Sequence, residues 1–340
     1  MEITTVGLDI AKNIFHAHGV DKNGKIVFQK PFKRKQLLPF FANLNRCVIG
    51  IESCASSHYW QRQLEKCGHE VRLISPQFVT PYVKSNKNDA RDAEAICEAV
   101  SRPNMRFVPR KSVEQHDIQM IHRVRSRLVK QRTALANQIR GLLGEYGIII
   151  QQGIAHIRKQ IPLILEDGEN ELTPLSREIF FGLYKELLEF DKQITCFDQR
   201  LKRLARTNTE CQKLQAIPGI GPTIATALLM SVGSAKEFKN GRHMAAWMGL
   251  VPKQHSSGGK SRLLGISKRG DSYLRTLLVH GARAVASKVK NNPQHENQWL
   301  YKLIERRGLN KACVAYANKM ARQAWVLLTK DEVYRNTYAC

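Results

Sequence analysis

The sequence predicts a mixed protein, with an α/β layer at its N-terminus and a mainly helical remainder. Segments rich in β-forming residues alternate with helical segments up to about residue 108, strand signals stop from about Ser112, and a long heptad pattern follows. A chain of 340 residues provides about two average domains. We expect an α/β domain over residues 1–108, a coiled-coil connector over 109–206 and a mainly helical C-terminal domain over 207–340.

The α/β layer is expected to open with a β-hairpin. The β-rich segment ITTVGLDIA is followed by IFHAHGV and KIVFQKPF, which flank the turn DKNG at residues 21–24. Further along, the pattern predicts a short helix at 37–41, a strand at 47–53, a helix at 59–67, a strand at 69–75 and a helix at 90–102. Strands interleaved with helices predict a sheet whose central strands are buried on both faces.

The middle of the chain has the spacing of an antiparallel coiled-coil arm. Apolar residues alternate at intervals of three and four, at Phe180, Leu183, Leu187, Phe190, Ile194, Phe197, Leu201 and Leu204. An earlier helix over 113–143 has a weaker matching pattern at Ile121, Val124, Leu128, Leu135 and Leu142. The segment 144–174 would connect the two helices, so the arm would position domains or pair subunits.

The C-terminal part opens with a glycine turn between apolar helical flanks. The sequence PGIG at residues 218–221 has the form of a helix-hairpin-helix, in which backbone N–H groups near Gly219 and Gly221 face a phosphate. A plain turn between two helices is the structural alternative. Helices are expected at 276–289, 298–306 and 310–328.

The charge predicts a polyanionic partner. The chain has 54 Lys and Arg against 29 Asp and Glu, a net charge of +25, and nucleic acid is the leading candidate. Between residues 239 and 290 there are eleven basic residues and a single acid, Asp271. On the first arm helix, five cations are candidate contacts to RNA or DNA, or else a solvated helix face: Arg123, Arg125, Arg127, Lys130 and Arg132.

Several other classes of protein are not expected. The sequence has no run of 18 apolar residues and no signal-peptide pattern, so we expect no membrane span and a cytosolic location. The eight cysteines form no C-x-x-C pair, so structural zinc is improbable and most of them are expected to be small core residues.

Four carboxylates stand out because of where they occur. Asp9 and Glu52 lie in otherwise apolar strands, where an acid is costly unless it is paired or binds a metal. Asp89 and Asp92 are three residues apart at a helix start, so they project from one face. If the four converge, their oxygen-only donor set suits Mg²⁺ or Mn²⁺. Taken alone, Asp89 could also be a helix cap.

A serine and glycine motif lies in the most basic part of the chain. The residues SSGGK occupy 256–260, and two glycines would let the backbone approach a phosphate closely. A Walker A motif is excluded, because Gln254 stands where its first glycine is required. The motif could be only a flexible loop. The neighbouring cations that could hold a phosphate are Lys260, Arg262, Lys268 and Arg269.

In combination these motifs resemble a known family. The sequences GLDIAK, IES, KNDARDAEAI, PGIG, GLVP, SSGGK and GISKRGDSYLR are similar to those of the DEDD-type insertion-sequence transposases of bacteria, the IS-one-ten family with its IS-eleven-eleven branch. The resemblance covers nearly the whole chain. It implies a RuvC-like, RNase H-type N-terminal domain, a coiled-coil connector and a C-terminal transposase domain.

The resemblance also implies residue roles and partners. Asp9, Glu52, Asp89 and Asp92 would form the metal-binding tetrad, and Ser257, with Ser256 as the alternative, would attack DNA to form a phosphoserine link. The implied activity is cutting and rejoining of donor and target DNA under the direction of an element-encoded noncoding RNA. An even-numbered assembly, a dimer or tetramer, is expected because two duplexes must be held at once.

Three other functions remain open from the residues alone. A RuvC-like nuclease that hydrolyses branched DNA explains the acids equally well and leaves SSGGK unexplained. An actin-like phosphotransferase fits poorly, because Ala11, Lys12 and Asn13 stand where its phosphate loop needs glycine and a hydroxyl residue. A non-catalytic nucleic-acid-binding protein gives no reason for acids in apolar strands.

Overall fold

The computed structural model describes residues 2–84, 88–330 and 332–335. The chain divides into two compact units, Met1–Lys111 (unit 1) and Ser112–Cys340 (unit 2). The arm helices and the C-terminal helices fall in the same unit, so the division at residue 206 stays a prediction. Within the described ranges no helix is both long enough and apolar enough for a transmembrane segment.

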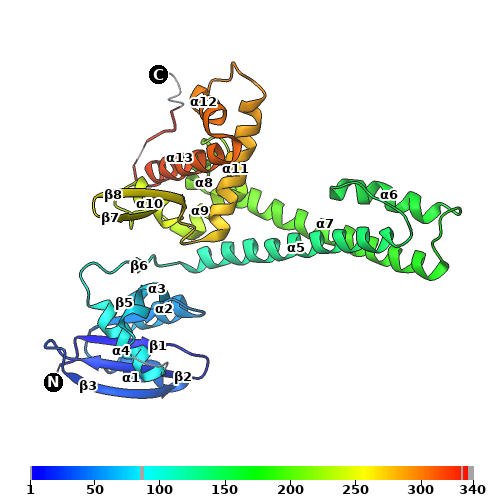
Figure 1. Ribbon diagram of the computed structural model, residues 1–340. Helices are drawn as coiled ribbons and strands as arrows, with labels where there is room; N and C mark the ends of the chain where they lie inside the picture. Colours follow the sequence, from blue (N-terminus) through cyan, green and yellow to red (C-terminus); the bar gives the residue numbers. More distant parts are fainter. Residues whose placement is uncertain (1, 85–87, 331, 336–340) are drawn as a thin grey trace. The chain divides into compact units, whose positions relative to one another are not determined.

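Unit 1 is built on a six-stranded mixed sheet (Figure 1). The strand order is β3-β2-β1-β4-β5-β6, in which β1, β4 and β5 run parallel and the other neighbours pair antiparallel. The mixed α/β architecture predicted for this part is confirmed. The elements are β1 (Thr5–Asp9), β2 (Ile14–Val20), β3 (Ile26–Lys33), α1 (Arg34–Ala42), β4 (Val48–Glu52), α2 (Ser57–Lys66), β5 (Glu70–Ile74), α3 (Pro76–Val79), the 3-10 helix η1 (Thr80–Tyr82), α4 (Asp89–Val100) and β6 (Phe107–Val108).

The predicted hairpin is present as β2 and β3. Its turn closes with a hydrogen bond from the Asp21 N–H to the Lys25 carbonyl, at 3.0 Å. The Asp21 carboxylate accepts from the N–H groups of Asn23 and Lys25, which explains why an aspartate begins this turn.

The two faces of the sheet carry different helices. Alternate residues of the central strands, such as Leu8 and Ile51, are buried in one core with side chains of α1 and α2, including Phe41 and Trp60. The opposite face is covered by α4, which packs against β1, β2 and β4. The central strands are therefore buried on both faces, as the sequence predicts, whereas the edge strand β3 is largely exposed.

Unit 2 contains two long helices and a helical bundle (Figure 1). Its elements are α5 (Val113–Gly144), α6 (Ile154–Glu166), α7 (Pro174–Thr207), α8 (Thr209–Gln215), α9 (Pro222–Val232), α10 (Gly241–Trp247), β7 (Pro252–Ser257), β8 (Lys260–Ile266), α11 (Ser272–Lys290), α12 (Gln298–Arg307) and α13 (Leu309–Thr329). The core of the bundle is formed by α8 to α13 and joins residues as distant in sequence as Cys211 and Leu328.

The long helices α5 and α7 pack side by side and run in opposite directions. Their ion pairs show the direction, because Arg125 contacts Asp198 whereas Arg132 contacts Asp191. The residues of α7 predicted to face a partner helix alternate between fully and partly buried. On α5 the prediction was wrong at Leu142, which is 41% exposed; Ile139 and Leu143 are buried instead.

The expected connector between these helices contains a further helix, α6. It packs on α7 and buries Ile157 and Ile161. The sequence does not predict this helix, because Gly153 stands at its N-cap and Pro162 lies within it. The helical-pair arm predicted from the heptads is therefore a three-helix arrangement at its far end.

Strands do occur after Ser112, which the sequence pattern did not predict. β7 and β8 pair antiparallel and are joined by Gly258 and Gly259, which both have positive φ, 54° and 75°. Two glycines in this conformation form the tight turn that suits a two-residue hairpin. Nearly all residues of these strands are exposed, so no alternation of apolar and polar residues predicts them.

Candidate active site

Two glycines on neighbouring strands seat α4 directly on the sheet. Gly7 on β1 and Gly50 on β4 are in register. A Cβ added at Gly7 would lie 2.1 Å from the Ala93 carbonyl oxygen, and one at Gly50 would lie 2.8 Å from Val100 Cβ. Only glycine allows this close approach. As a result, the first turn of α4 lies beside the end of β1.

This packing gathers three of the four predicted acids. Each of Asp9, Asp89 and Asp92 offers a carboxylate oxygen, and these oxygens all lie within 4.8 Å of one another. Asp9 ends β1, while Asp89 and Asp92 belong to the first turn of α4. At this separation, two carboxylates repel by about 3–4 kcal/mol at an effective dielectric constant of about 20. An oxygen-only cluster of this kind fits a hard divalent cation.

Glu52 lies on the adjacent strand but is not part of that group. It ends β4, one residue beyond the paired residues Leu8 and Ile51, so it projects on the same face as Asp9. Both carboxylates influence the Cys54 thiol, whose pKa is raised by burial and, in addition, by the negative charges of Asp9 and Glu52. Glu52 therefore borders the cluster.

His16 is a site residue that the sequence pattern did not reveal. It lies directly across the ladder from Asp9, and its Nδ1 is 3.9 Å from the Asp89 carboxylate. The signal was the alternation in IFHAHGV, which places His16 and His18 on one face of the strand. The strand pairing that brings His16 to Asp9 is a tertiary contact with no local sequence signature.

Asn88, and not Asp89, caps α4. The Asn88 side chain accepts a hydrogen bond from the Ala90 N–H at 3.0 Å. Asp89 is the first residue of the helix, and its side chain is left to join the acidic cluster. The alternative in which Asp89 serves as the helix cap is therefore wrong.

The hairpin of β7 and β8 presents Ser257 beside its turn. In the ladder Ser257 pairs with Lys260 and His255 pairs with Arg262, so these four side chains share one face. Ser256 lies on the other face, opposite Ser261, and its hydroxyl accepts a hydrogen bond from Gln254 at 2.8 Å. Ser257 is therefore the serine that shares a face with cations.

Lys268 and Arg269 lie in the exposed loop that follows β8. The loop is fixed by the Lys268 N–H, which donates to the Gly249 carbonyl at 3.2 Å. Arg275 also holds it, donating to the carbonyls of Met248 and Arg269. Lys268 has a left-handed backbone conformation, with φ of 55°. The cationic side chains thus project from a well-anchored turn.

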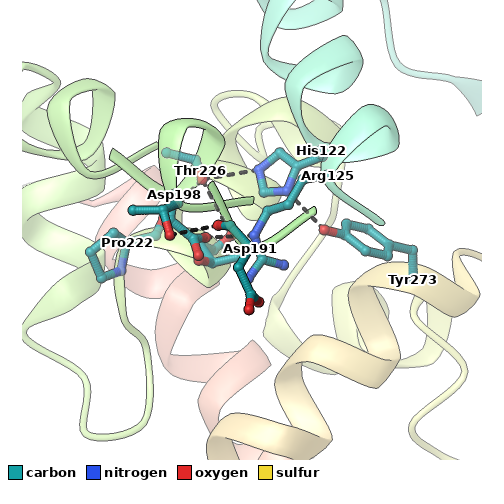
Figure 2. Close-up of polar contacts among 9 residues, drawn as sticks. His122, Arg125, Asp191, Asp198, Pro222, Thr226 and Tyr273 are labelled. Carbon is teal, nitrogen blue, oxygen red and sulfur yellow. Dashed lines mark hydrogen bonds and ion pairs between the residues drawn. The ribbon is translucent and has the colours of Figure 1, made fainter. Parts of the chain in front are cut away.

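The five predicted arm cations fall into two groups. Arg125 donates across to Asp198 of α7 at 2.5 Å (Figure 2). Arg132 donates across to Asp191 of α7 at 2.7 Å. Burial raises the pKa of Asp191, but hydrogen bonds from Arg158 and Arg132 outweigh it and leave that pKa lowered. These two arginines join helices. The other three, Arg123, Arg127 and Lys130, line a cavity of about 470 Å³.

His122 and Tyr273, which line that cavity, belong to a buried polar network. Figure 2 shows the contacts of this network. His122 on α5 contacts the Tyr273 hydroxyl at 2.9 Å through Nδ1 and the Thr226 hydroxyl at 3.0 Å through Nε2. Thr226 in turn donates to the Pro222 carbonyl at 2.8 Å, so its hydroxyl oxygen accepts from the N–H at Nε2 of His122. Burial, with a smaller effect of the Arg125 charge, lowers the pKa of His122 to about 4.

The two glycines of the PGIG turn differ in their surroundings. Gly219 has φ of 93°, and an added Cβ would lie 2.9 Å from the Gly281 carbonyl oxygen of α11. It therefore allows the turn to pack closely on that helix. Gly221 precedes α9 and is exposed, with open space where a Cβ would lie.

Comparisons with known proteins agree with the motifs. The family model described as Transposase IS116/IS110/IS902 family matches residues 211–299, and the model of DEDD transposases of IS110, described as Transposase, matches residues 6–148. The chain is 48% identical to a probable family 20 transposase of Pseudomonas aeruginosa, over 98% of this chain and 99% of the relative.

Two further relatives are named for insertion sequences. Identity is 48% to the transposase for insertion sequence element IS1111A of Coxiella burnetii, over 98% of this chain and 92% of the relative. It is 41% to the transposase for insertion sequence element IS1328 of Yersinia enterocolitica, over 98% of each chain. The chain therefore belongs to the IS116/IS110/IS902 family of transposases, of the DEDD type, and is an enzyme that acts on DNA.

Proposed function

We propose that this transposase cuts and rejoins DNA through a covalent link between Ser257 and a DNA phosphate. The observation that carries the proposal is the β7–β8 hairpin, on which Ser257 shares an exposed face with Lys260 and Arg262. A purely hydrolytic nuclease needs no such serine. Cations on the same face suit the negative charge that develops on a phosphate under attack.

We infer that unit 1 is a RuvC-like, RNase H-type domain. The inference is supported by a central sheet that carries Asp9 on β1 and Glu52 on the neighbouring strand, with two more acids on α4. The resemblance of the sequence motifs to the DEDD-type transposases supports two further inferences. These are a coiled-coil arm formed by α5 and α7 and a helix-hairpin-helix at residues 218–221. The proposed domains remain 1–108, 109–206 and 207–340.

The acidic cluster fits a divalent cation. Asp9, Asp89 and Asp92, with Glu52 at its border, would hold Mg²⁺ or Mn²⁺. When bound, such an ion stabilises the extra negative charge of a phosphate under attack. The carboxylates hold the ion, and His16 packs beside them and helps to fix Asp89.

The serine step balances as a phosphoryl transfer. A P–O bond forms between Ser257 Oγ and the scissile phosphorus, while the bond from that phosphorus to the sugar oxygen breaks. The serine proton goes to a base, for which His255 on the same face is the candidate, and the sugar oxygen gains a proton. Attack of a sugar hydroxyl on the phosphoserine reverses the step and rejoins the strand.

The remaining cations are proposed to hold nucleic-acid backbones. Arg123, Arg127 and Lys130 of α5 line a cavity that Met230, Asp271 and Tyr273 of the helical bundle also line. Lys268 and Arg269 extend the basic surface near the hairpin. The exposed N-terminus of α9 at Gly221 would add backbone N–H groups. The resemblance supports a noncoding guide RNA as well as donor and target DNA, and an even-numbered assembly.

The test of the serine is Ser257→Ala, with Ser256→Ala as the matched control. The purified full chain is incubated with end-labelled insertion-sequence DNA, the element's RNA and Mg²⁺, and products are separated without protease treatment. We expect Ser257→Ala to abolish both cleavage and the covalent protein–DNA band while nucleic-acid binding is retained. Ser256→Ala should form the adduct.

Other outcomes assign other chemistry. If Ser257→Ala cleaves normally in Mg²⁺, the serine proposal is wrong, and metal-dependent hydrolysis of branched DNA takes its place. If Ser256→Ala alone loses the adduct, the nucleophile lies on the opposite face of the hairpin.

The test of the metal site is Asp9→Asn. We expect cleavage to fall at least a hundredfold, because several kcal/mol of transition-state stabilisation is lost, about 1.4 kcal/mol per factor of ten. Thermal stability in EDTA should be unchanged or raised, since one repelling charge is removed. The measurements are cleavage rate and melting temperature. A much lower melting temperature with cleavage intact would show a structural role instead.

A further inference from the structure

A second concave surface lies on the helical bundle of unit 2, and none of the candidate site residues described above lines it. It has a volume of about 700 Å³ and is bordered by the start of α10, by Trp299 of α12 and by one face of α13. Its charged lining residues are Arg242, Lys319 and Arg322, and no acid lines it within the described part of the chain. We call this surface the Trp299 groove.

Two tryptophans line the groove, and the ring of Trp299 is more exposed to solvent than that of Trp325. Trp299 is 43% exposed, although Asn297 caps α12 and fixes its first turn. One side of the indole is backed by Tyr316, with ring centroids 6.5 Å apart. The Lys319 ammonium lies 4.8 Å from the Trp299 ring centroid, as in a cation–π contact. The ammonium lies over the ring, but a lysine side chain is flexible, so an exposed aromatic ring of this kind can still serve as a stacking platform for a nucleobase.

The walls of the groove are fixed by hydrogen bonds and close packing. Trp325 donates to the Phe238 carbonyl at 3.1 Å, and Asn318 donates to the Leu250 carbonyl at 3.1 Å. Gly241 allows α10 to touch α13, because a Cβ there would lie 2.9 Å from the Arg322 carbonyl oxygen. This close approach brings Arg242 to the same rim as Arg322.

Two groups in the groove favour an anionic, hydrogen-bonding occupant. The pKa of Lys319 is lowered by burial and then by the positive charge of Arg322, so an added anion would stabilise its ammonium form. Gln323 Oε1 is buried, and among the residues that the structure describes it accepts no hydrogen bond. Every nucleobase that pairs has an N–H donor on its Watson–Crick edge, whereas a bare phosphate has none.

We propose that the Trp299 groove binds an unstacked nucleotide of a nucleic-acid strand, with the base against Trp299 and its phosphates among Arg242, Lys319 and Arg322. In a duplex each base is stacked between its neighbours, so the groove takes unpaired strands and not intact duplex. The proposal rests on the proposed function only in that nucleic acid is the substrate. It is independent of the serine and of the acidic cluster.

The test measures binding without chemistry. The full chain carries Ser257→Ala and is kept in EDTA, and fluorescence anisotropy follows labelled dT20, U20 and a 20-base-pair duplex. Trp299→Leu removes the ring and keeps an apolar side chain, and Trp299→Phe keeps a ring. We expect Trp299→Leu to weaken binding of single strands about tenfold and to leave duplex binding within twofold, while Trp299→Phe stays close to the parent protein.

Variants that remove charge distinguish binding in the Trp299 groove from general electrostatic attraction to a protein of net charge +25. Arg242→Gln combined with Arg322→Gln should lower the log–log salt slope for single strands by about 1.4, or about 0.7 for each phosphate that is no longer neutralised. The matched control, Lys192→Gln with Lys202→Gln on the exposed side of α7, removes the same charge outside the groove. It should change that slope by less than half as much.

The outcomes are distinct from those of the serine test. A preference for U20 or for dT20 in the ring-dependent part of binding identifies the strand as RNA or DNA. If Trp299→Leu binds both single strands as tightly as the parent, or weakens duplex equally, the proposal is overturned. A change of oligomeric state without a change in binding would also overturn it and assign the groove to a protein contact. Should Trp299→Leu fail to fold, the phenylalanine variant and the variants that remove charge decide.

Discussion

At the scale of single residues, the acids of the cluster could be predicted from the sequence, whereas the neighbouring His16 could not. Asp9 is conspicuous in sequence because a carboxylate in an apolar strand needs a partner or an ion. Asp89 and Asp92 follow from helical spacing. His16 could not be found in this way, since it reaches Asp9 through pairing of β1 with β2. The same reasoning overlooked Asn88, whose cap frees Asp89.

The buried histidine of unit 2 predicts a specific pH dependence. The pKa of His122 is about 4 in the folded chain against an ordinary value of 6.5, because burial disfavours its charged form. Between these values the unfolded chain binds the extra proton. The stabilising effect is therefore complete above pH 6.5 and is lost as the pH falls towards 4, by at most about 3 kcal/mol.

The measurement is urea unfolding of the parent and of His122→Gln at pH 4.5, 5.5 and 7.5. Gln stays neutral and can still hydrogen-bond to Thr226 and Tyr273. We expect the difference in unfolding free energy between the two proteins to shift in favour of His122→Gln as the pH falls. A difference that is constant with pH would show that His122 is not held neutral.

At the scale of elements, glycine pairs decide where helices lie. Gly7 and Gly50 bring α4 onto β1 and β4, and that packing positions the two α4 acids of the cluster beside Asp9. The strands and α4 themselves were predictable, because their apolar patterns are local. The distance between α4 and the sheet was not, since it depends on which residues of two distant strands share a register.

Replacing Gly7 tests this dependence. We expect Gly7→Ala to displace α4, to lower the stability of unit 1 by about 1–3 kcal/mol and to abolish DNA cleavage. The control is Gly141→Ala on exposed α5, where a Cβ meets nothing within 4 Å. Its stability should be equal or about 1 kcal/mol higher. Thermal unfolding measures the stability, and a cleavage assay measures the activity. Unaltered cleavage by Gly7→Ala would show that the close packing of α4 on β1 does not position the acids.

At the scale of the whole molecule, the cations behind the net charge of +25 have two roles, pairing with acids between helices and lining a proposed surface for nucleic acid. The sequence does not separate these roles. Five arm cations look alike in sequence, yet two of them join α5 to α7 and three line a cavity. The distinction depends on Asp191 and Asp198, which lie more than fifty residues further along the chain. Composition therefore predicted the class of partner, while the roles of individual cations required the packed helices.

Neutralising the two groups of arm cations should change different properties, nucleic-acid binding for the cavity-lining group and stability for the helix-joining group. Changing Arg123, Arg127 and Lys130 to Gln should lower the salt slope of duplex binding by up to about 2.7, or about 0.9 for each phosphate neutralised, with little change in melting temperature. Changing Arg125 and Arg132 to Gln should cost about 1–2 kcal/mol of stability, because both pairs are only partly exposed, and should spare the slope. Anisotropy titrations and urea unfolding provide the two readouts. Equal effects of both sets would contradict the division.

The β7–β8 hairpin has one more implication. Its residues are exposed on both faces, and a two-stranded ribbon of this kind gains little from burial, so its local opening costs little free energy. The proposed nucleophile, Ser257, therefore lies on a segment whose rigidity depends on the groups that bind it. If Ser257 is the nucleophile, we expect it to reach a reactive position only when bound nucleic acid orders the hairpin, so that unrelated DNA is spared.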